Sequence, residues 1–313
     1  MKMFLDPWPP DFDPPVALDP ALYDGPVDTT IETSVWQAIA NPQQRLFGKI
    51  FFLDGARRID ARILVQTQKG DTVHGLFGTT AAGCVESEGT KATIRAIDIK
   101  RLLILGGGLV ENPTIDIGCV GFQYEGFATR AESPQDVLGK LQYLMRENEA
   151  KLGQTLLQEG SCVFVDGPLT YFSSSCESMV GVVKKIQQPY LDPLHFGLVS
   201  RLEPGQRTPL FHIPDPKHER YSWYLRLAPV RRIDHAMSSI LRLEVRVALG
   251  VDAAVRLADF SALELPRFAS TSARDPRAPQ NLVPIGALES EMHRQMGDAL
   301  LVRRAIERRL SSQ

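Results

Sequence analysis

The sequence predicts an α/β fold in which a mixed sheet is flanked by helices. Several segments alternate apolar and polar residues with a period of two, which is typical of strands. A long amphipathic pattern over residues 133–157 predicts a helix between two groups of strands, and two shorter helical patterns close the chain. No segment repeats, so we expect these elements to form one mixed domain rather than an array of repeats.

The first group of strands is expected to form an antiparallel meander. Residues 48–53 are apolar and are followed by Asp54-Gly55, a common turn pair, so we expect the strand to stop there. Residues 58–66 alternate and are predicted to form the returning strand. Residues 71–79 and 91–105 continue the pattern, and neighbouring strands of this kind pair antiparallel.

The central helix has clear signals at both ends. Ser133 can cap it, Pro134 suits its first turn, and Gly160 lies just beyond its end. Its apolar stripe, which also includes Glu149, consists of Leu138, Leu141, Met145, Leu152 and Leu156. A carboxylate in such a stripe is costly to bury unless it is paired or bound to a metal.

The second half of the chain is expected to add strands and then helices. A short strand, residues 162–165, ends at Asp166-Gly167. The further strand-like segments are residues 179–186, 221–227 and 240–249. The two closing helices are predicted over residues 284–296 and 298–310.

The N-terminal segment differs from the rest in composition. Residues 1–42 are rich in Pro and Asp and form an arm in our division of the chain, while residues 43–313 form the main domain. A short helix is predicted over residues 34–40. Because the arm is rich in structure-breaking residues and carries Trp8, we expect it to dock on a partner.

Composition excludes several classes of protein. The net charge is −2, so no overall field draws the chain to a polyanion, although local basic pairs can still line a groove. The N-terminus lacks an apolar signal core and no apolar run reaches the roughly 18 residues of a membrane span, so we expect a cytoplasmic protein. The cysteines lack the spacing of a zinc site and are expected to be reduced packing residues: Cys84, Cys119, Cys162 and Cys176.

The acidic residues carry the functional prediction. Asp54 and Asp166 each follow an apolar strand, and the ends of neighbouring strands are where ligands bind in α/β folds. Hard divalent cations, Mg²⁺ or Mn²⁺, prefer such oxygen ligands. The alternatives are that Asp-Gly is only a turn pair and that Glu149 pairs with Arg146 one turn away. Glu147 is a second candidate on the helix, but it lies off the stripe.

The order of these acids resembles the layout of nucleases with an RNase H-like core. That layout is an acidic strand end, a meander, a helix with Glu, and a second acidic strand end. In that chemistry two metal ions roughly 3.5–4 Å apart hold the scissile phosphate. Asp54 would then bridge both ions, while Glu149 and Asp166 would each hold one.

The sequence also resembles the NurA family, nucleases that work with the HerA translocase. The matching segments run along most of the chain and are Asp54-Gly55 with Arg57-Arg58-x-Asp60, Arg146-x-x-Glu149, residues 165–169, residues 180–184, residues 223–227 and residues 241–244. The resemblance implies a Mn²⁺-dependent DNA nuclease, possessing 5′–3′ exonuclease and single-strand endonuclease activity, in the resection of double-strand break ends. It also implies a homodimer and a HerA-type hexameric ATPase as partner.

The resemblance implies residue roles as well. Asp54, Glu149 and Asp166 match the metal-binding acids, and Lys184 could neutralise charge on the phosphate, its alternative being a solvated strand end. Tyr224 matches an aromatic that helps catalysis, unless it is a core residue. The basic residues proposed to contact DNA are Arg57, Arg58, Lys184 and Lys185.

One departure from the family concerns its last catalytic position. The family often ends with an Ala-His pair, which residues 278–289 lack. His293 on the following helix could substitute, or it could be an ordinary surface residue. The alternative function is therefore a non-catalytic subunit that binds DNA ends or the ATPase and keeps the fold.

Overall fold

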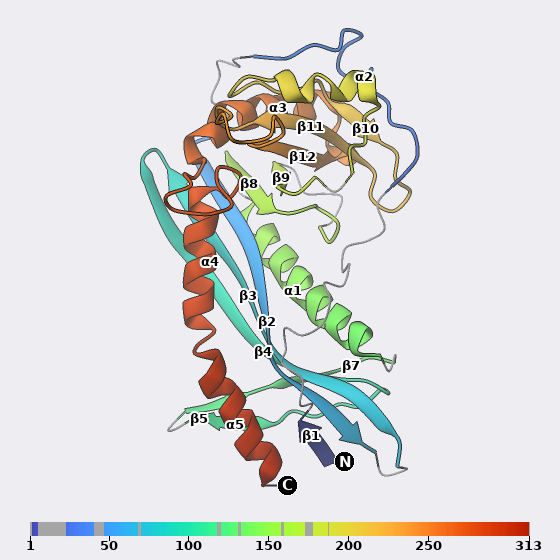
Figure 1. Cartoon of the computed structure of the whole chain (residues 1–313), viewed down its shortest axis with the longest axis vertical. Helices are drawn as coiled ribbons and strands as arrows, with labels where there is room; N and C mark the ends of the chain where they lie inside the picture. Colours follow the sequence, from blue (N-terminus) through green and yellow to red (C-terminus); the bar gives the residue numbers. More distant parts are fainter. Residues whose placement is uncertain are drawn as a thin grey trace.

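A large mixed sheet organises the protein, and helices lie along both of its faces (Figure 1). The computed structural model describes residues 2–5, 23–40, 47–67, 70–117, 120–130, 133–157, 160–172, 178–186 and 188–312. The large sheet has ten strands in the order β10-β11-β12-β9-β8-β2-β3-β4-β7, with β1 paired to β2. The predicted class, an α/β fold with an RNase H-like core and a mixed sheet flanked by helices, is confirmed.

The strands are long in the first half of the chain and short in the second. In chain order they are Lys2–Leu5 (β1), Lys49–Gln66 (β2), Thr72–Glu88 (β3), Lys91–Leu105 (β4), Thr114–Ile117 (β5), Val120–Gln123 (β6), Glu125–Ala128 (β7), Ser161–Asp166 (β8), Met179–Val183 (β9), Phe211–Ile213 (β10), Arg220–Arg226 (β11) and Ile240–Arg246 (β12). β8 pairs parallel with both β2 and β9, and β7 pairs parallel with β4. β5 and β6 form a separate two-stranded sheet.

The helices fall mostly in the second half of the chain. The α-helices are Pro134–Leu156 (α1), Pro193–Phe196 (α2), Val251–Glu264 (α3), Val283–Gln295 (α4) and Ala299–Ser311 (α5). Three short 3₁₀ helices are Val199–Arg201 (η1), Val247–Leu249 (η2) and Leu265–Phe268 (η3). The Ser133 side chain accepts a hydrogen bond from the Asp136 N–H at 3.2 Å, so the predicted cap of α1 is confirmed.

Alternation along the strands separates two cores on the two faces of the sheet. Leu102 and Ile104 pack against Leu141 of α1, whereas Leu103 and Leu105 pack against Ile306 of α5. Successive strand residues point to opposite faces. α1 therefore covers one face, and α4 and α5 run along the other (Figure 1).

The first strand of the meander does not end at Asp54-Gly55, and the predicted returning strand over residues 58–66 is wrong. β2 continues through both residues to Gln66, because β3 pairs with it along this whole stretch, Asp54 opposite Gly83 and Gly55 opposite Ala82. The chain turns only after Thr67, whose N–H donates to the Asp71 carbonyl at 2.9 Å. Extended pairing thus outweighed a local turn signal.

Two smaller predictions also need correction, and one helix was missed. Residues 34–40 are not helical, because the backbone of Ile39 is paired with Arg207 in an isolated bridge. The helix α3 was not predicted; it follows Gly250 and has no capping side chain. The strand predicted over residues 240–249 ends at Arg246, where η2 begins.

The described part of the N-terminal segment, residues 23–40, lies against the main body. Glu32 forms an ion pair with the buried Arg207 at 2.8 Å, and the Trp36 indole N–H donates to the His195 carbonyl at 3.0 Å. Trp8 and its neighbouring prolines fall outside the described residues, so the division at residue 42 stays a prediction.

Two of the four cysteines, Cys84 and Cys162, are free and buried as predicted, and the other two lie outside the described residues. Among the helices of the described residues, none combines the length and the apolar composition that crossing a bilayer requires.

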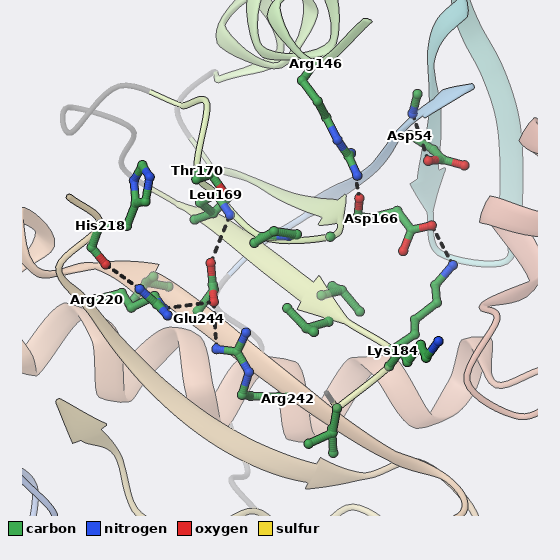
Figure 2. Close-up of a pocket in the computed structure, with 18 of the residues that line it drawn as sticks. Asp54, Arg146, Asp166, Leu169, Thr170, Lys184, His218, Arg220, Arg242 and Glu244 are labelled. Carbon is green, nitrogen blue, oxygen red and sulfur yellow. Dashed lines mark hydrogen bonds and ion pairs between the residues drawn. The ribbon is translucent and has the colours of Figure 1, made fainter. Parts of the chain in front are cut away.

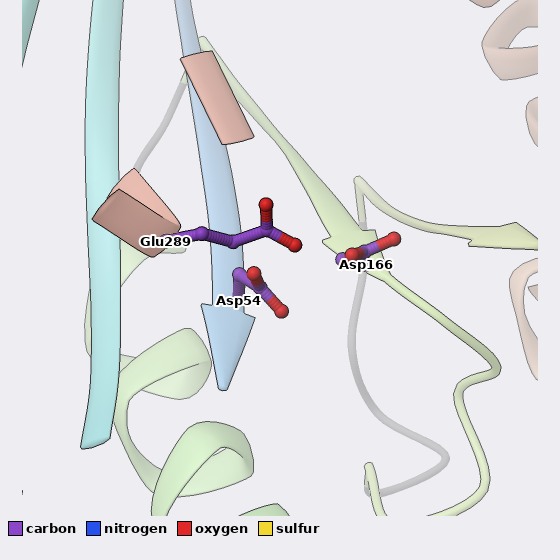
Figure 3. Close-up of side chains that lie close together, drawn as sticks. All are labelled: Asp54, Asp166 and Glu289. Carbon is purple, nitrogen blue, oxygen red and sulfur yellow. The ribbon is translucent and has the colours of Figure 1, made fainter. Parts of the chain in front are cut away.

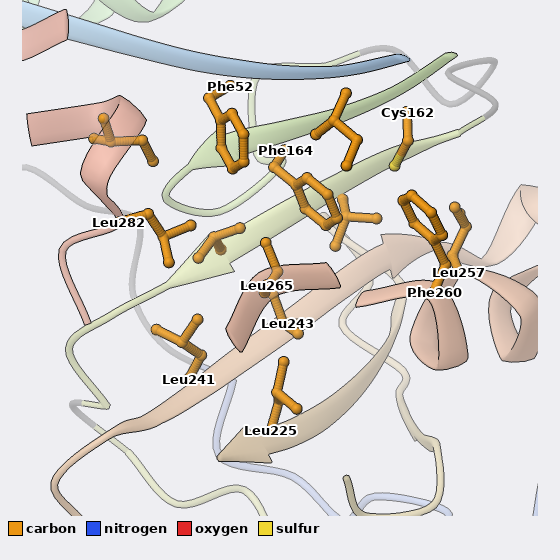
Figure 4. Close-up of a cluster of buried hydrophobic side chains, with 14 of the residues drawn as sticks. Phe52, Cys162, Phe164, Leu225, Leu241, Leu243, Leu257, Phe260, Leu265 and Leu282 are labelled. Carbon is orange, nitrogen blue, oxygen red and sulfur yellow. The ribbon is translucent and has the colours of Figure 1, made fainter. Parts of the chain in front are cut away.

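Phe164 lies at the centre of the largest apolar cluster, which joins β2, β8 and α3 (Figure 4). Its ring stacks on those of Phe52 and Phe260, with centroids 5.8 and 6.3 Å apart. We expect Phe164→Ala to lower the free energy of unfolding by about 3–5 kcal/mol, because it leaves a cavity. Urea denaturation followed by circular dichroism measures this.

The matched control for this prediction is Ile233→Ala, since Ile233 is 84% exposed. We expect that change to stay within about 0.5 kcal/mol of the wild type. A small loss for Phe164→Ala would contradict the central position of this ring.

Candidate active site

Parallel pairing of β2 with β8 places Asp54 beside Asp166. Phe52 lies opposite Phe164 and Leu53 opposite Val165, and the two aspartates come next in each strand. Because the register is parallel and unshifted, both side chains leave the sheet on the face used by the two phenylalanines. That face is the one covered by α4. The structure thus brings the two aspartates close together, as the sequence predicted.

The two Asp-Gly pairs have the same sequence but different backbone conformations. Gly167 has a φ of +113°, a conformation that favours glycine, and the chain turns there under the side chain of Arg146. Gly55 stays in the strand, and its N–H donates to the Asp54 carboxylate at 2.8 Å. Only Asp166 therefore ends its strand, and Asp54 lies where β8 stops pairing with the longer β2.

A third carboxylate, Glu289 of α4, completes the group (Figure 3). Gly83, the partner of Asp54 in β3, has no side chain, and a Cβ there would come within 2.9 Å of Leu288. This close approach of α4 to the sheet holds Glu289 over Asp54. One oxygen from each of Asp54, Asp166 and Glu289 lies within 4.8 Å of the others, a spacing at which one cation could bind all three.

The electrostatics of this group favour a bound cation. Asp54 is 5% exposed, and its carboxylate accepts no hydrogen bond other than that from Gly55 and forms no ion pair within the described part of the chain. Burial, and then the charges of Asp166 and Glu149, hold the pKa of Asp54 well above its usual range. Two like charges about 5 Å apart repel by roughly 3 kcal/mol at an effective dielectric constant of about 20.

Lys184 supplies the nearest positive charge. It follows β9, and its ammonium group donates to the Asp166 carboxylate at 2.7 Å and to the Asn281 side-chain carbonyl at 2.6 Å. The Asn281 amide in turn donates to Glu289 at 3.3 Å. The loop before α4, which lacks the family's Ala-His pair, thus contributes Asn281 to the site.

Glu149 lies on the other side of the sheet from Glu289, beneath Gly55. It is fully buried and accepts a hydrogen bond from Arg146 at 2.8 Å, as the alternative interpretation of this residue expected. Its second oxygen has no hydrogen-bond partner in the described residues. Burial raises the pKa of Glu149, against the opposing charge of Arg146.

Arg146 links this glutamate to the strand end, because it also donates to the Asp166 carbonyl at 3.2 Å (Figure 2). Glu147, the other candidate on α1, points away and pairs with Lys151 at 3.3 Å. Of the two glutamates, Glu149 is therefore the one whose charge helps to raise the pKa of Asp54. The group of three carboxylates, however, contains Glu289 and not Glu149.

Glu289 is ionised in this arrangement. Burial works to raise its pKa, but hydrogen bonds from Arg277 outweigh it and leave the pKa below the usual value. Arg277 donates to both carboxylate oxygens of Glu289, at 2.9 and 2.5 Å, and its side chain is 57% exposed. An exposed arginine can move aside, so this contact does not block a ligand from the acids.

A cavity of about 530 Å³ opens in front of the acids. Of the other predicted site residues, Arg57, Lys184, Lys185 and His293 line it. The Arg57 guanidinium donates to the Gln142 side chain at 2.6 Å. His293 is exposed and lies one turn beyond Glu289 on α4, so it reaches the rim of the same cavity.

Two predicted site residues are not brought to the acids. Arg58 uses its guanidinium within the protein, donating to Asp60 at 2.8 Å and to the carbonyls of Met296 and Gly297. Tyr224 is fully buried in an apolar cluster, where its ring stacks on Phe211, and burial raises its pKa to about 12. The structure therefore gives Tyr224 the core position that was its alternative.

Glu289 was missed by sequence reasoning, although a signal for it existed. It falls within the buried stripe of α4, between Ile285 and Met292, just as Glu149 falls within the stripe of α1. The same criterion, a carboxylate on an apolar helix face, would have selected both. Asn281 had no comparable signal, because its position depends on the loop before α4.

Comparison with known proteins places this chain in a family. A model of the NurA domain matches residues 111–285, which is more than half of the chain. The crystal structure of the NurA nuclease from Sulfolobus solfataricus aligns over 88% of both chains at a TM-score of 0.52 and 10% identity. Human ENDOV, at 15% identity, aligns over 80% of this chain and 87% of its own, with a TM-score of 0.37. No curated protein matched.

The fold and the acidic group together define the class, a mixed α/β protein with a group of three carboxylates at the edge of a cavity. The chain belongs to the NurA family. The likeness to the Sulfolobus structure extends beyond the matched segment, since it covers 88% of this chain.

We expect a divalent cation to stabilise the protein through this group. At a free Mn²⁺ concentration of 100 times the Kd, binding to the folded state alone adds about 2.7 kcal/mol to the free energy of unfolding. Urea denaturation with Mn²⁺ and with EDTA measures this difference. In Asp54→Asn the difference should vanish.

The matched control is Glu291→Gln, which removes an acid of α4 that pairs with Arg294 away from the cavity. It should keep the full stabilisation. An equal response to Mn²⁺ in Asp54→Asn and the wild type would show that the ion binds elsewhere.

Proposed function

We propose that this chain is a divalent-metal-dependent DNA nuclease that hydrolyses phosphodiester bonds. One observation carries the proposal: oxygens of Asp54, Asp166 and Glu289 lie within 4.8 Å of one another, and Lys184 donates to one of these acids. Membership of the NurA family supports the same activity. A cluster of acids alone would attract any cation, but a neighbouring lysine in an open cavity also suits a phosphate.

The residues fit a hard divalent cation. All three groups offer carboxylate oxygens, and the pKa of Asp54 is held high by burial and by its acidic neighbours, a cost that a cation would remove. Asp54, Asp166 and Glu289 would hold it, and the unpartnered oxygen of Glu149 offers a further ligand for a second ion, as the two-metal scheme requires. Bound ions would supply the positive charge that lets water attack a phosphodiester.

The chain's own side chains complete the chemistry. Lys184 is fixed by Asp166 and Asn281, so its ammonium group is placed to stabilise negative charge that develops on a phosphate oxygen. Arg146 holds the strand end through the Asp166 carbonyl. Arg57 and Lys185 line the cavity and would bind the flanking backbone of the strand. His293 at the rim could transfer a proton to or from solvent.

The more detailed parts of the proposal come from the family. They are Mn²⁺ as the working ion, with Mg²⁺ as the alternative, 5′–3′ exonuclease and single-strand endonuclease activity, and a role in resecting double-strand break ends. A homodimer and a HerA-type hexameric ATPase are the proposed partners. The relative whose fold this chain shares is itself described as a nuclease, the NurA protein of Sulfolobus solfataricus.

We expect Asp54→Asn, Asp166→Asn and Glu289→Gln each to lower the rate of DNA cleavage by about 100-fold or more. Each change removes a negative oxygen on which cation binding and transition-state charge depend. Labelled linear DNA incubated with Mn²⁺, with EDTA as the blank, measures the rate. Circular dichroism checks that each variant is folded.

Matched pairs on two helices sharpen this test. Glu291→Gln is the control for Glu289→Gln on α4, and Glu147→Gln is the control for Glu149→Gln on α1. Both controls should cleave at the wild-type rate, because Glu291 pairs with Arg294 and Glu147 pairs with Lys151, away from the two aspartates. If folded wild-type protein does not cleave DNA, even with its ATPase, the non-catalytic DNA-end or ATPase-binding subunit becomes the function. That alternative draws support from the missing Ala-His pair.

A further inference from the structure

The cavity in front of the acids has a second wall of different chemistry (Figure 2). It is formed by β11, β12, the loop before β11 and the residues that follow β9, on the side away from Asp54. The charged residues of this wall are Lys185, Asp215, Arg220, Arg242, Glu244 and Arg246. Four are cationic and two are acidic, so this end of the cavity carries an excess of positive charge, whereas the other end carries the three carboxylates.

Glu244 is the fixed centre of the wall. It is 2% exposed; one oxygen accepts the Leu169 N–H at 2.9 Å and the other accepts Arg242 at 2.7 Å and lies 3.3 Å from the Arg220 Nε. Burial works to raise its pKa, but the two arginines outweigh it and leave the pKa lowered. Glu244 therefore stays ionised and anchors both guanidinium groups.

Arg220 uses both of its terminal nitrogens within the protein. Besides Glu244 it contacts the Asp215 carboxylate at 3.4 Å, the His218 carbonyl at 2.6 Å and the Tyr190 hydroxyl at 3.1 Å. These contacts hold the loop before β11 against the wall. Arg220 thus shapes the wall, and Asp215 balances its charge.

Arg242 is different, because most of its donors remain available. Its Nη1 donates to Glu244 at 2.7 Å and to the Ser222 hydroxyl at 3.3 Å. Its Nε and Nη2 have no acceptor in the described part of the chain, yet the side chain is 5% exposed and lines the cavity. Because Arg242 lines the cavity, these donors can meet a ligand there, and the planar fork of a guanidinium matches the oxygens of a phosphate.

We propose that this basic wall binds the terminal phosphate of a DNA strand whose nearby bond is cleaved at the acids. The inference rests on the proposed nuclease function. A terminal phosphate carries up to two negative charges, against one on an internal diester, and the wall has two cations more than acids. Behind Arg242 and Glu244 lies the buried body of the sheet, which suits a strand end better than a continuing strand.

Arg246 and Lys185 flank this position. The Arg246 side chain is half-buried and donates to the Phe172 carbonyl at 2.9 Å, and Lys185 is exposed. Arg246 is the last residue of β12, and Lys185 lies two residues after the end of β9. They would therefore add charge around the phosphate that Arg242 grips with its fork.

The test compares oligonucleotides of one sequence that end in a 5′-phosphate, in a 3′-phosphate, or in hydroxyls at both ends. Fluorescence anisotropy of labelled DNA gives the Kd for the full chain carrying Asp54→Asn, which prevents cleavage, in EDTA. We expect about tenfold or tighter binding of one of the phosphorylated strands. Arg242→Gln should abolish that preference.

Arg246→Gln is the second variant, in case the buried Arg242 is needed for folding, and thermal melting checks both. Arg231→Gln is the matched control, because Arg231 is an exposed arginine paired with Asp234 and lies outside the cavity. It should keep the preference. If the wall variants weaken all three strands equally and Arg231→Gln does not, the wall binds an internal phosphate, and the terminal assignment is overturned.

If the wall variants bind every strand as Arg231→Gln does, the wall binds no phosphate and the inference fails. Failure of the proposed function is a separate result, because it is seen as the absence of DNA cleavage by protein with an intact Asp54 in Mn²⁺, whereas the wall is tested by binding in EDTA.

Discussion

The parallel pairing of β2 with β8 is the constraint on which the site depends. It puts Asp54 and Asp166 side by side on one face of the sheet, one residue beyond the stacked pair Phe52 and Phe164. A large apolar cluster behind those rings fixes the register, because a slip by one residue would turn the phenylalanines out of the core. The packing that stabilises the fold therefore also holds two like charges together.

This arrangement is unfavourable without a cation, and the surrounding residues only partly relieve it. Lys184 pairs with Asp166 and Arg277 with Glu289, but Asp54 has no ion pair in the described chain, and burial raises its pKa. A protein that needed only stability would gain from an apolar residue at this position. Function is the better explanation for a carboxylate that the fold leaves uncompensated.

The cavity then combines two opposite chemistries. Its acidic end suits a cation and its basic wall suits a phosphate. A cavity with both features suits a nucleic-acid strand better than a neutral small molecule. Glu244 connects the two ends, because it anchors Arg242 and also accepts the backbone of Leu169, three residues after Asp166.

Much of this could be predicted from the sequence. The stripe and cap of α1 and the strand before Asp166 follow from local periodicity, and the expectation that the two aspartates meet came from the strand ends on which they lie. The end of β2 did not, because pairing with β3 carries the strand through a turn-like Asp-Gly. Glu289 and the basic wall escaped for a different reason: their positions depend on how α4 and β12 pack against strands that are distant in sequence, which no local pattern records.

The most direct measurement of the central claim is anomalous diffraction from a crystal of the protein soaked in Mn²⁺. We expect an anomalous peak within bonding distance of oxygens from Asp54, Asp166 and Glu289. A fully ordered site with no peak between the two aspartates at saturating Mn²⁺ would contradict the claim that these acids share a cation.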